Sequence, residues 1–520
     1  MNSHKSRRAF LKSTTAIAAG TAITPLLSAC SDSDSGTNPL TSSEQLALTS
    51  SQAVAAIRQG AISAEAYMQT LIARADLLAG LNAFITLDKV GALAAARKVD
   101  AMRAAGTTLP ALAGLPIVVK DNINTKDLPT TGGTLALRNV RPTANAPTLQ
   151  KLLDAGAIVL GKTNMHELAF GITSTNLTPF AGAVKNPYDK TRIPGGSSGG
   201  TAVAIAARIV PAGLGTDTGG STRVPAALTG IVGLRPSVGN GGAERRYDGA
   251  GVLPISHTRD TVGPMGRSVA DVALLDSVVT GSTLAKPVAL TGLRIGVPAT
   301  FWAGLDTQVA AVMSAARTKL AGAGMVFVDV DTVGLSDLNN KVSFQVALHE
   351  PITDIPAYLA ATGVTGISLA DIAAQVSSPD VKGAFGAILG DVFGPAYADA
   401  INVHRPAMQA LYARYFTDNK LDAVMFPTTI LPATTIDPVN GSATVSINGG
   451  PPADTFGTYI RNTDPGSNAG IPGLSLPAGM TTSGLPVGLE LDGPVGSDLK
   501  LLSIGLAIEA LIGGVPAPAL

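Results

Sequence analysis

The chain is dense in glycine over residues 194–233, where it reads Pro194-Gly-Gly-Ser-Ser-Gly-Gly200 and later Gly215-Thr-Asp-Thr-Gly-Gly-Ser221. Between these two serine segments, residues 202–210 form an Ala/Val/Ile run that predicts a buried helix. Glycine lets backbone segments approach each other without a Cβ clash. We therefore expect a tightly packed region here.

Apolar periodicity on both sides of this region predicts strands that alternate with helices. Upstream, it predicts a helical run that starts near Thr49 and extends to Ile57, with Ser50 or Ser51 as its cap. It also predicts helices over 64–78, 89–105 and 146–155, and buried strands over 115–120 and 157–160, the latter closed by Gly161. Downstream, it predicts a strand over 293–297, a helix over 309–321, a strand over 423–426, a helical stretch over 340–415 and loops over 430–466. Such alternation favours an α/β fold.

The composition is that of a large globular enzyme. Of 520 residues, 46% are hydrophobic and 14% are charged, well below the roughly 25% charged residues of an average soluble protein. Such a chain can bury a large core, which excludes disorder for most of its length. The 37 basic and 37 acidic residues balance. The chain has no long basic run of the kind that would indicate nucleic acid binding. The single cysteine excludes a disulfide framework and Cys-ligated metal.

Residues 1–30 are interpreted as an export signal. Ser6-Arg7-Arg8-Ala9-Phe10-Leu11-Lys12 is a twin-arginine pattern, and residues 13–27 form an apolar run too short to span a bilayer. Leu27-Ser28-Ala29-Cys30 is similar to a lipobox, which predicts lipidation of Cys30; the alternative is a plain signal peptide with a chance cysteine. Residues 31–44 are expected to form a flexible tether, and 45–520 the enzyme domain. The predicted location is periplasmic or membrane-anchored.

Several hydrolytic mechanisms can be tested on the residues. Cysteine-based hydrolysis fails because Cys30 lies in the leader, and the histidines after the leader stand alone, without metal-ligand spacing. Gly195-Gly-Ser-Ser-Gly199 matches the G-x-S-x-G nucleophile elbow, but residues 191–194 make a poor strand before it. Ser497-x-x-Lys500 matches a β-lactamase spacing but is more typical of a helix N-cap. There remain Lys120, at the end of an apolar strand, and the two serines Ser197 and Ser221.

In these settings the chain resembles the amidase signature family. Ser197 precedes Ser221 by 24 residues and Lys120 precedes it by 101, as in that family. Further matches are Gly161-Lys-Thr-Asn164, Asn186-Pro187, Asp260-Thr-Val-Gly-Pro264, Arg267-Ser-Val-Ala-Asp271 and Gly484-Leu-Pro-Val-Gly488. The resemblance covers about residue 45 to the C-terminus. It implies a single large α/β domain, with a central mixed sheet enclosed by helices.

The resemblance also implies a role for each of these side chains. Ser221 would be the nucleophile, Ser197 a bridging serine that follows a cis Gly196–Ser197 peptide bond, and Lys120 the base. A serine hydroxyl needs a base to take its proton. A lysine can serve only when it is neutral, which burial favours.

The loop before Ser221 would complete the site. Backbone N–H groups of Thr218, Gly219, Gly220 and Ser221 are expected to form the oxyanion hole. Asp217 and Arg223 are expected to brace this loop, the alternative being an ordinary surface ion pair. Thr216 is expected to support Ser197 or Ser221. The chemistry needs no cofactor and no metal.

The substrate is expected to be a small carboxamide or anilide. Residues 253–261 are more similar to aryl-acetamide hydrolases, such as those of indoleacetamide and mandelamide, than to peptide amidases. The pocket is expected from residues 165–180 and 300–465, and an apolar acyl group could contact Phe170, Phe180, Phe344, Phe456 and Tyr459, for which plain core packing is the alternative.

Other functions stay open. Esters and carbamates would use the same residues. An amidotransferase A-type subunit would need a cytoplasmic partner complex, against which the leader argues, and a binding lipoprotein with an inactive site would lack one of the three residues. The expected partners are a small-molecule amide and, through Cys30, a membrane. A homodimer is one of the open oligomeric states.

Overall fold

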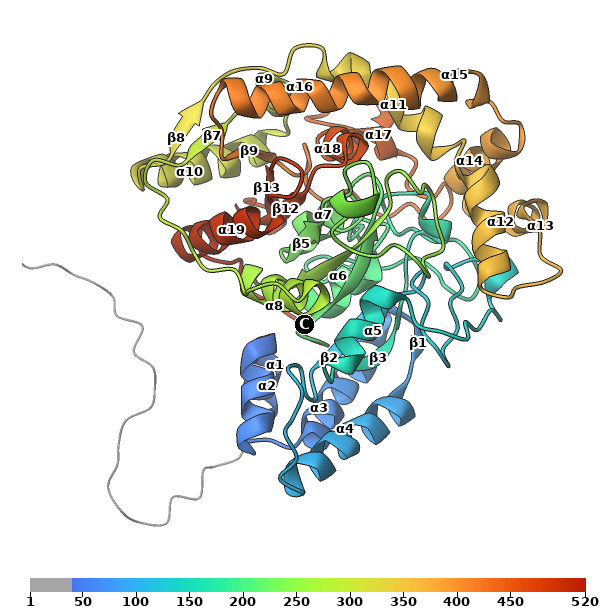
Figure 1. The fold of residues 1–520 in the computed structure, drawn as a ribbon, viewed down its shortest axis with the longest axis vertical. Coiled ribbons are helices and arrows are strands. Elements are labelled where there is room, and N and C mark those ends of the chain that lie inside the picture. Colours follow the sequence, from blue (N-terminus) through green and yellow to red (C-terminus); the bar gives the residue numbers. More distant parts are fainter. Residues whose placement is uncertain (1–39) are drawn as a thin grey trace, which may run out of the picture. The chain divides into compact units, whose positions relative to one another are not determined.

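A computed structural model describes residues 40–520 (Figure 1). The predicted signal peptide, Cys30 and most of the predicted tether lie outside the described residues. Among residues 40–520, no helix combines the length and the apolar character that crossing a bilayer requires.

The centre of the domain is one mixed sheet of eleven strands, in the order β1-β3-β2-β4-β6-β5-β12-β13-β9-β7-β8. Its strands are β1 Phe84–Leu87, β2 Pro116–Lys120, β3 Ile158–Thr163, β4 Ala212–Asp217, β5 Val232–Arg235, β6 Thr261–Gly266, β7 Arg294–Gly296, β8 Val326–Val328, β9 Ala423–Pro427, β12 Gly473–Met480 and β13 Pro486–Asp492. β2 pairs in parallel with β3 and β4, and β7 with β8 and β9, whereas the other neighbours are antiparallel. A small second sheet pairs β10 Thr444–Val445 with β11 Ala453–Asp454.

Helices enclose this sheet, as Figure 1 shows. They are α1 Ser42–Ala47, α2 Ser50–Gln59, α3 Ala64–Leu77, α4 Lys89–Ala104, α5 Pro147–Asp154, α6 Gly199–Ala206, α7 Arg223–Thr229, α8 Val269–Thr280, α9 Ala299–Trp302, α10 Thr307–Gly322, α11 Leu335–Ala347, α12 Pro351–Ala361, α13 Leu369–Gln375, α14 Pro379–Leu389, α15 Gly394–Asp399, α16 Arg405–Asp418, α17 Thr455–Ile460, α18 Asp464–Ala469 and α19 Asp498–Ile512. The mixed sheet with covering helices confirms the α/β fold expected from the sequence.

Two helices next to the serine segments are completely buried. Every residue of α6 and of α7 is buried, which explains why α6 carries small and apolar residues on all sides. α7 lies directly against β13, where a Cβ added to Gly488 would come within 2.4 Å of the Cβ of Ala227. Glycine at position 488 is therefore required for this close packing, which holds the helix that begins just after Ser221.

The apolar core is divided between the two halves of the sheet. One cluster joins α2, α3, α4 and α6 to β2, β3 and β4, and a second joins α8, α10 and α19 to β9, β12 and β13. A third cluster packs α12, α13 and α14 against the loop after β3, through Leu168 and Phe170. This third cluster places α14 beside the loop that contains the first serine segment.

The helix and strand boundaries differ from the sequence predictions in a few places. α2 is capped by Thr49, whose hydroxyl accepts the N–H of Gln52, and not by Ser50 or Ser51. β3 continues beyond Gly161 to Thr163, because its last residues pair with both β1 and β2. α1 begins at Ser42, inside the range 31–44 assigned to the tether, since Thr41 and Glu44 form a capping box. α6 begins at Gly199, earlier than expected, and ends at Ala206.

Candidate active site

The three residues singled out in the sequence lie on different segments that meet at the carboxyl ends of neighbouring strands. Lys120 is the last residue of β2, Ser197 lies in the loop before α6, and Ser221 lies in the loop between β4 and α7. β2 and β4 are parallel neighbours. Their carboxyl ends therefore lie side by side, which is where α/β sheets commonly place their sites.

The surroundings of Ser197 do not form a nucleophile elbow. That motif needs a strand, a sharp turn and a helix. In the part of the chain that the structure describes, residues 191–194 contain only an isolated bridge between Arg192 and Thr435. The peptide bond between Gly196 and Ser197 is cis, as the resemblance implies.

Lys120 is completely buried and donates to two hydroxyl groups. Its Nζ lies 2.8 Å from Oγ of Ser197 and 2.7 Å from Oγ1 of Thr216. Burial lowers the pKa of Lys120 to about 7, although the negative charges of Asp217 and Asp260 act in the opposite direction. Near neutral pH, a large share of this lysine is therefore unprotonated. Thr216 contacts Lys120 directly and not, as expected, Ser197 or Ser221.

The two serines lie on adjacent segments and differ in exposure. The N–H of Ser198 donates to the carbonyl oxygen of Ser221 at 3.2 Å, whereas no hydrogen bond joins the hydroxyls of Ser197 and Ser221 among the described residues. Ser197 is completely buried, and Ser221 opens onto a cavity. Catalytic hydrogen bonds are often loose before substrate binds, so this arrangement is compatible with a proton relay.

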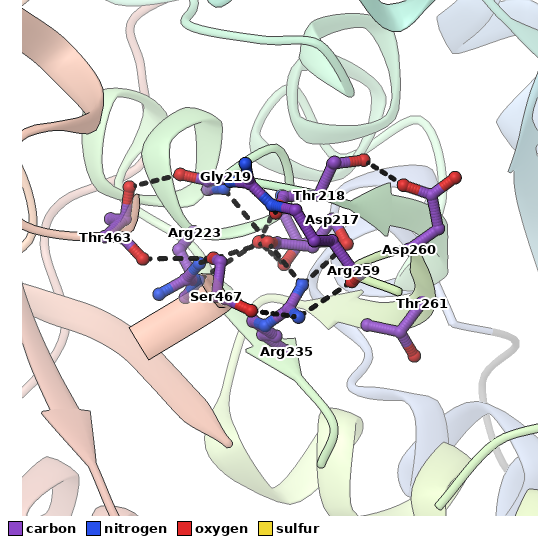
Figure 2. Close-up of polar contacts among 12 residues, drawn as sticks. Asp217, Thr218, Gly219, Arg223, Arg235, Arg259, Asp260, Thr261, Thr463 and Ser467 are labelled. Carbon is purple, nitrogen blue, oxygen red and sulfur yellow. Dashed lines mark hydrogen bonds and ion pairs between the residues drawn. The ribbon is translucent and has the colours of Figure 1, made fainter. Parts of the chain in front are cut away.

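Two carbonyl oxygens of the loop before Ser221 are held by side-chain donors. The carbonyl of Thr218 accepts from Nε of Arg259, and that of Gly219 from the hydroxyl of Thr463 (Figure 2). In a trans peptide the C=O and N–H point in opposite directions, so the N–H of Gly219 points away from Arg259.

One of the four expected oxyanion donors is already used. The N–H of Gly220 donates to Oδ1 of Asp217 at 2.9 Å. Within residues 40–520, the N–H groups of Thr218, Gly219 and Ser221 have no hydrogen-bond partner. The loop therefore leaves three of the expected donors free to bind an oxyanion.

Asp217 holds this loop in place through hydrogen bonds and ion pairs. Its carboxylate accepts from the N–H groups of Gly220 and Thr222, and from the guanidinium groups of Arg223 and Arg235 (Figure 2). Burial alone would raise the pKa of Asp217, but the two arginines lower it far below its usual value. Asp217 and Arg223 are both 0% exposed, so they are not an ordinary surface ion pair.

The network continues into residues that the sequence did not single out. Arg235 donates to the carbonyl oxygen and to the carboxylate of Asp217, and Arg259 forms an ion pair with Asp464. The hydroxyl of Thr218 donates to Asp260 at 2.6 Å. Asp260 begins the motif Asp260-Thr-Val-Gly-Pro264, so the sequence could have identified it as a site residue. Arg235 and Asp464 belong to no recognisable motif.

A second buried lysine supports the segment after Lys120. Lys162, in the Gly161-Lys-Thr-Asn164 motif, donates to the carbonyl oxygen of Ile123 and to the hydroxyl of Thr130, each at 2.8 Å, and lies 3.4 Å from Asp121. Burial lowers its pKa to about 8, against the opposing effect of Asp121. A lysine inside a buried strand was the signal that could have identified it.

Ser221, Thr218 and Gly219 line a cavity of about 650 Å³. Of the aromatic residues expected there, Phe170, Phe344 and Phe456 do line it. The other two do not: Phe180 is 38% exposed at the surface, and Tyr459 is buried with its hydroxyl donating to the carbonyl oxygen of Pro432. Phe393 is a further aromatic residue of the wall. The cavity is thus mainly apolar around the serine.

One histidine that stands alone in the sequence is not alone in space. His257 lies 3.0 Å from Asp354 and 3.5 Å from Glu350. These three residues are the one group within residues 40–520 whose ligand atoms lie close enough together for a metal. The carboxylate of Glu350, however, already accepts from the hydroxyls of Ser256, Thr258 and Tyr397. The cluster is therefore explained by hydrogen bonds within the protein.

Comparison with known families decides the assignment. The family described as Amidase matches residues 66–502. The chain belongs to this amidase family. The amidase is 43% identical to the indoleacetamide hydrolase of Agrobacterium vitis, over 86% of its own length and 93% of that relative. It is 41% identical to the mandelamide hydrolase of Pseudomonas putida, over 91% and 92% of the two chains.

Solved structures agree with the family and the fold. A crystal structure of an amidase superposes with a TM-score of 0.78 at 31% identity, covering 90% of this chain and all of that one. The peptide amidase of Stenotrophomonas maltophilia superposes with a TM-score of 0.73 at 29% identity, covering 91% and 98%. This amidase is therefore a single-domain hydrolase that acts on amide C–N bonds.

The Asp217 network predicts a large stability effect. Asp217→Asn removes the buried charge that Arg223 and Arg235 share and leaves Arg235 without a carboxylate partner, so we expect it to lower the free energy of unfolding by about 3–5 kcal/mol. Asp329→Asn is the matched control, because Asp329 pairs with Arg317 at the surface with 66% of its side chain exposed, and we expect it to change stability by less than about 1 kcal/mol. Urea denaturation measures both, and equal losses would contradict the proposed role of Asp217.

Proposed function

We propose that this amidase hydrolyses small carboxamides or anilides with an aromatic or apolar acyl group, through an acyl-enzyme on Ser221. The observation that carries the proposal is the position of Ser221 in a mainly apolar cavity, on a segment adjacent to that of Ser197, which contacts the buried Lys120. The aryl-acetamide names of two relatives support the same acyl class.

The reaction begins with proton transfer away from Ser221. Neutral Lys120 accepts the proton of the Ser197 hydroxyl while Ser197 accepts that of Ser221, whose Oγ attacks the carbonyl carbon. The carbonyl oxygen becomes an oxyanion, which the free N–H groups of the loop before Ser221 stabilise; one such donor is typically worth about 10²–10³ in rate. Thr216 holds the Nζ of Lys120 in place for this transfer.

The C–N bond then breaks. Lys120 returns the proton through Ser197 to the nitrogen, which leaves as ammonia or an amine, and Ser221 remains as an ester of the acyl group. Water attacks this ester by the same relay, with its proton passing to Lys120. The acyl–oxygen bond of the ester breaks, Ser221 regains its proton and the carboxylic acid is released.

A substrate panel tests the reaction class. We expect phenylacetamide, indole-3-acetamide and mandelamide to be hydrolysed, with kcat/KM reduced at least about 10³-fold in Ser221→Ala. Methyl esters and carbamates of the same acyl groups test the alternatives. Amides and anilides that stay inert while esters or carbamates react would contradict the amidase proposal. Ammonia-dependent coupling to a copurified partner would favour an amidotransferase subunit.

Covalent labelling tests the roles of the two serines. A fluorophosphonate is expected to label Ser221, as mapped by peptide mass spectrometry, and the label is expected to be lost in Ser221→Ala. In Lys120→Ala labelling is expected to be slowed by about 10² or more, because the base is missing. Ser483→Ala, at a turn between β12 and β13, is the matched serine control. A label on Ser197 would show that the assignment of nucleophile is reversed.

The pKa of Lys120 predicts the pH profile of labelling. Only neutral Lys120 can accept a proton, and its pKa of about 7 places the protonated, inactive form below that pH. The labelling rate is therefore expected to rise through pH 7 and to level off above it. Circular dichroism across the same range serves as the control for unfolding. A rate that does not change between about pH 6 and 9 would exclude Lys120 as the base.

We also propose that the chain is exported by the twin-arginine pathway and anchored through a lipid on Cys30, as a periplasmic or membrane-anchored enzyme. The residue patterns of 1–30 support this location. Cys30→Ser is expected to move the enzyme from the membrane fraction to the soluble fraction; an unchanged distribution would contradict the lipid anchor. A homodimer remains a proposal for light scattering to decide.

A further inference from the structure

Three acidic side chains line the mainly apolar cavity of Ser221, and they differ in the cations and hydrogen-bond donors that contact them. Asp464 is paired with Arg259 and also accepts from the side-chain amides of Asn339 and Asn468. Asp454 is exposed and accepts the N–H of Gly457 as the cap of α17. Arg259 is the one cationic residue of the lining and is already used by Asp464. The third carboxylate, that of Asp380, has no arginine or lysine partner within the described residues.

Asp380 stands in the first turn of α14, with 29% of its side chain exposed. Oδ2 lies 2.9 Å from Nε2 of His166, but the ring N–H does not point along the line between these atoms. Oδ1 accepts the N–H of Val381, the next residue in the chain, at 3.0 Å. A carboxylate offers about four acceptor positions, so Asp380 retains acceptor capacity within the cavity.

The ring of His166 is fixed so that Nε2 faces Asp380. Its Nδ1 accepts the backbone N–H of Ser174 at 3.2 Å, which requires a lone pair on Nδ1 and leaves the ring proton on Nε2. The ring packs against the backbone of Gly171, where a Cβ would come within 2.2 Å of Nε2.

This pair lies close to the reacting serines. The backbone N–H of His166 donates to the carbonyl oxygen of Ser197 at 3.1 Å, so Asp380 is one side chain away from the bridging serine. Burial would raise the pKa of Asp380, but the His166 ring and the N–H of Val381 lower it below its usual value. The carboxylate is therefore ionised at neutral pH.

The other residues of α14 that line the cavity have no side-chain hydrogen-bond donor. They are Gly383, Ala384 and Ala387. An ionised carboxylate in such surroundings is costly unless a donor meets it. When a substrate fills the cavity and displaces water, the donor must come from that substrate.

We propose that Asp380 is a specificity-determining residue that accepts a hydrogen bond from an N–H or O–H group on the acyl part of the substrate. The enzyme thereby selects amides that carry a donor group in addition to the carboxamide. This inference rests on the proposed hydrolysis of aryl or apolar amides, since the donor is a feature of that acyl group. His166 acts as a positioning residue for the carboxylate.

A pair of isosteric substrates tests the proposal. Indole-3-acetamide has a ring N–H, whereas 1-benzothiophene-3-acetamide has sulfur at the same position. We expect the wild-type kcat/KM to favour the indole roughly 10- to 100-fold, as for a hydrogen bond to a charged group. In Asp380→Ala and Asp380→Asn, we expect this ratio to fall to within about threefold. Asp454→Asn, which removes an exposed charge of the same cavity, is expected to keep the wild-type ratio.

The outcomes separate the inference from the function on which it rests. Fluorophosphonate labelling of Ser221 shows, for each variant, whether the site is still assembled, and Asp380→Asn provides a second variant if Asp380→Ala does not fold. A wild-type ratio near one overturns the inference, and so does a high ratio that persists in both Asp380 variants. If the wild type is labelled at Ser221 but hydrolyses neither amide, the proposed function itself fails.

Discussion

The buried carboxylate of Asp217 is the interaction on which the rest of the site depends. It accepts one backbone N–H group on each side of Ser221, those of Gly220 and Thr222, and binds two arginines that come from α7 and β5. Arg223 extends the network to Glu490 of β13, and Arg235 extends it to the carbonyl oxygen of Arg259. Segments far apart in the chain are thus fixed around one charge, and the nucleophile-bearing loop cannot shift without breaking several buried bonds.

The same arrangement reconciles two opposing requirements. Lys120 must lose its proton near neutral pH, and burial favours that loss, but a nearby carboxylate favours the ammonium form. Arg223 and Arg235 offset the negative charge of Asp217. The loop therefore has a strong anionic anchor whose attraction for the lysine proton is weakened by its own partners.

The sequence was sufficient for features that depend on local pattern. α3 and α4 begin and end within one residue of the predicted boundaries, because their apolar spacing and capping residues are local. Lys120, Ser197 and Ser221 were identified because they stand in spaced motifs. The pairing of Arg259 with Asp464 joins residues 205 positions apart, and no local pattern reports such a contact. Likewise, Phe180 and Phe344 are alike in the sequence and both exposed, and only the folded chain shows that Phe344, on α11, lines the cavity.

The cavity is formed by two parts of the chain, one that carries the catalytic serine and one that contacts the acyl group. Its floor is the loop after β4, fixed by the buried charges, whereas its walls come largely from α11, α14 and α17. Side chains such as Ala347, Gly383 and Phe456 can therefore change size without touching the groups that move protons. A fold divided in this way can acquire new acyl preferences in small steps while its hydrolytic chemistry is inherited unchanged.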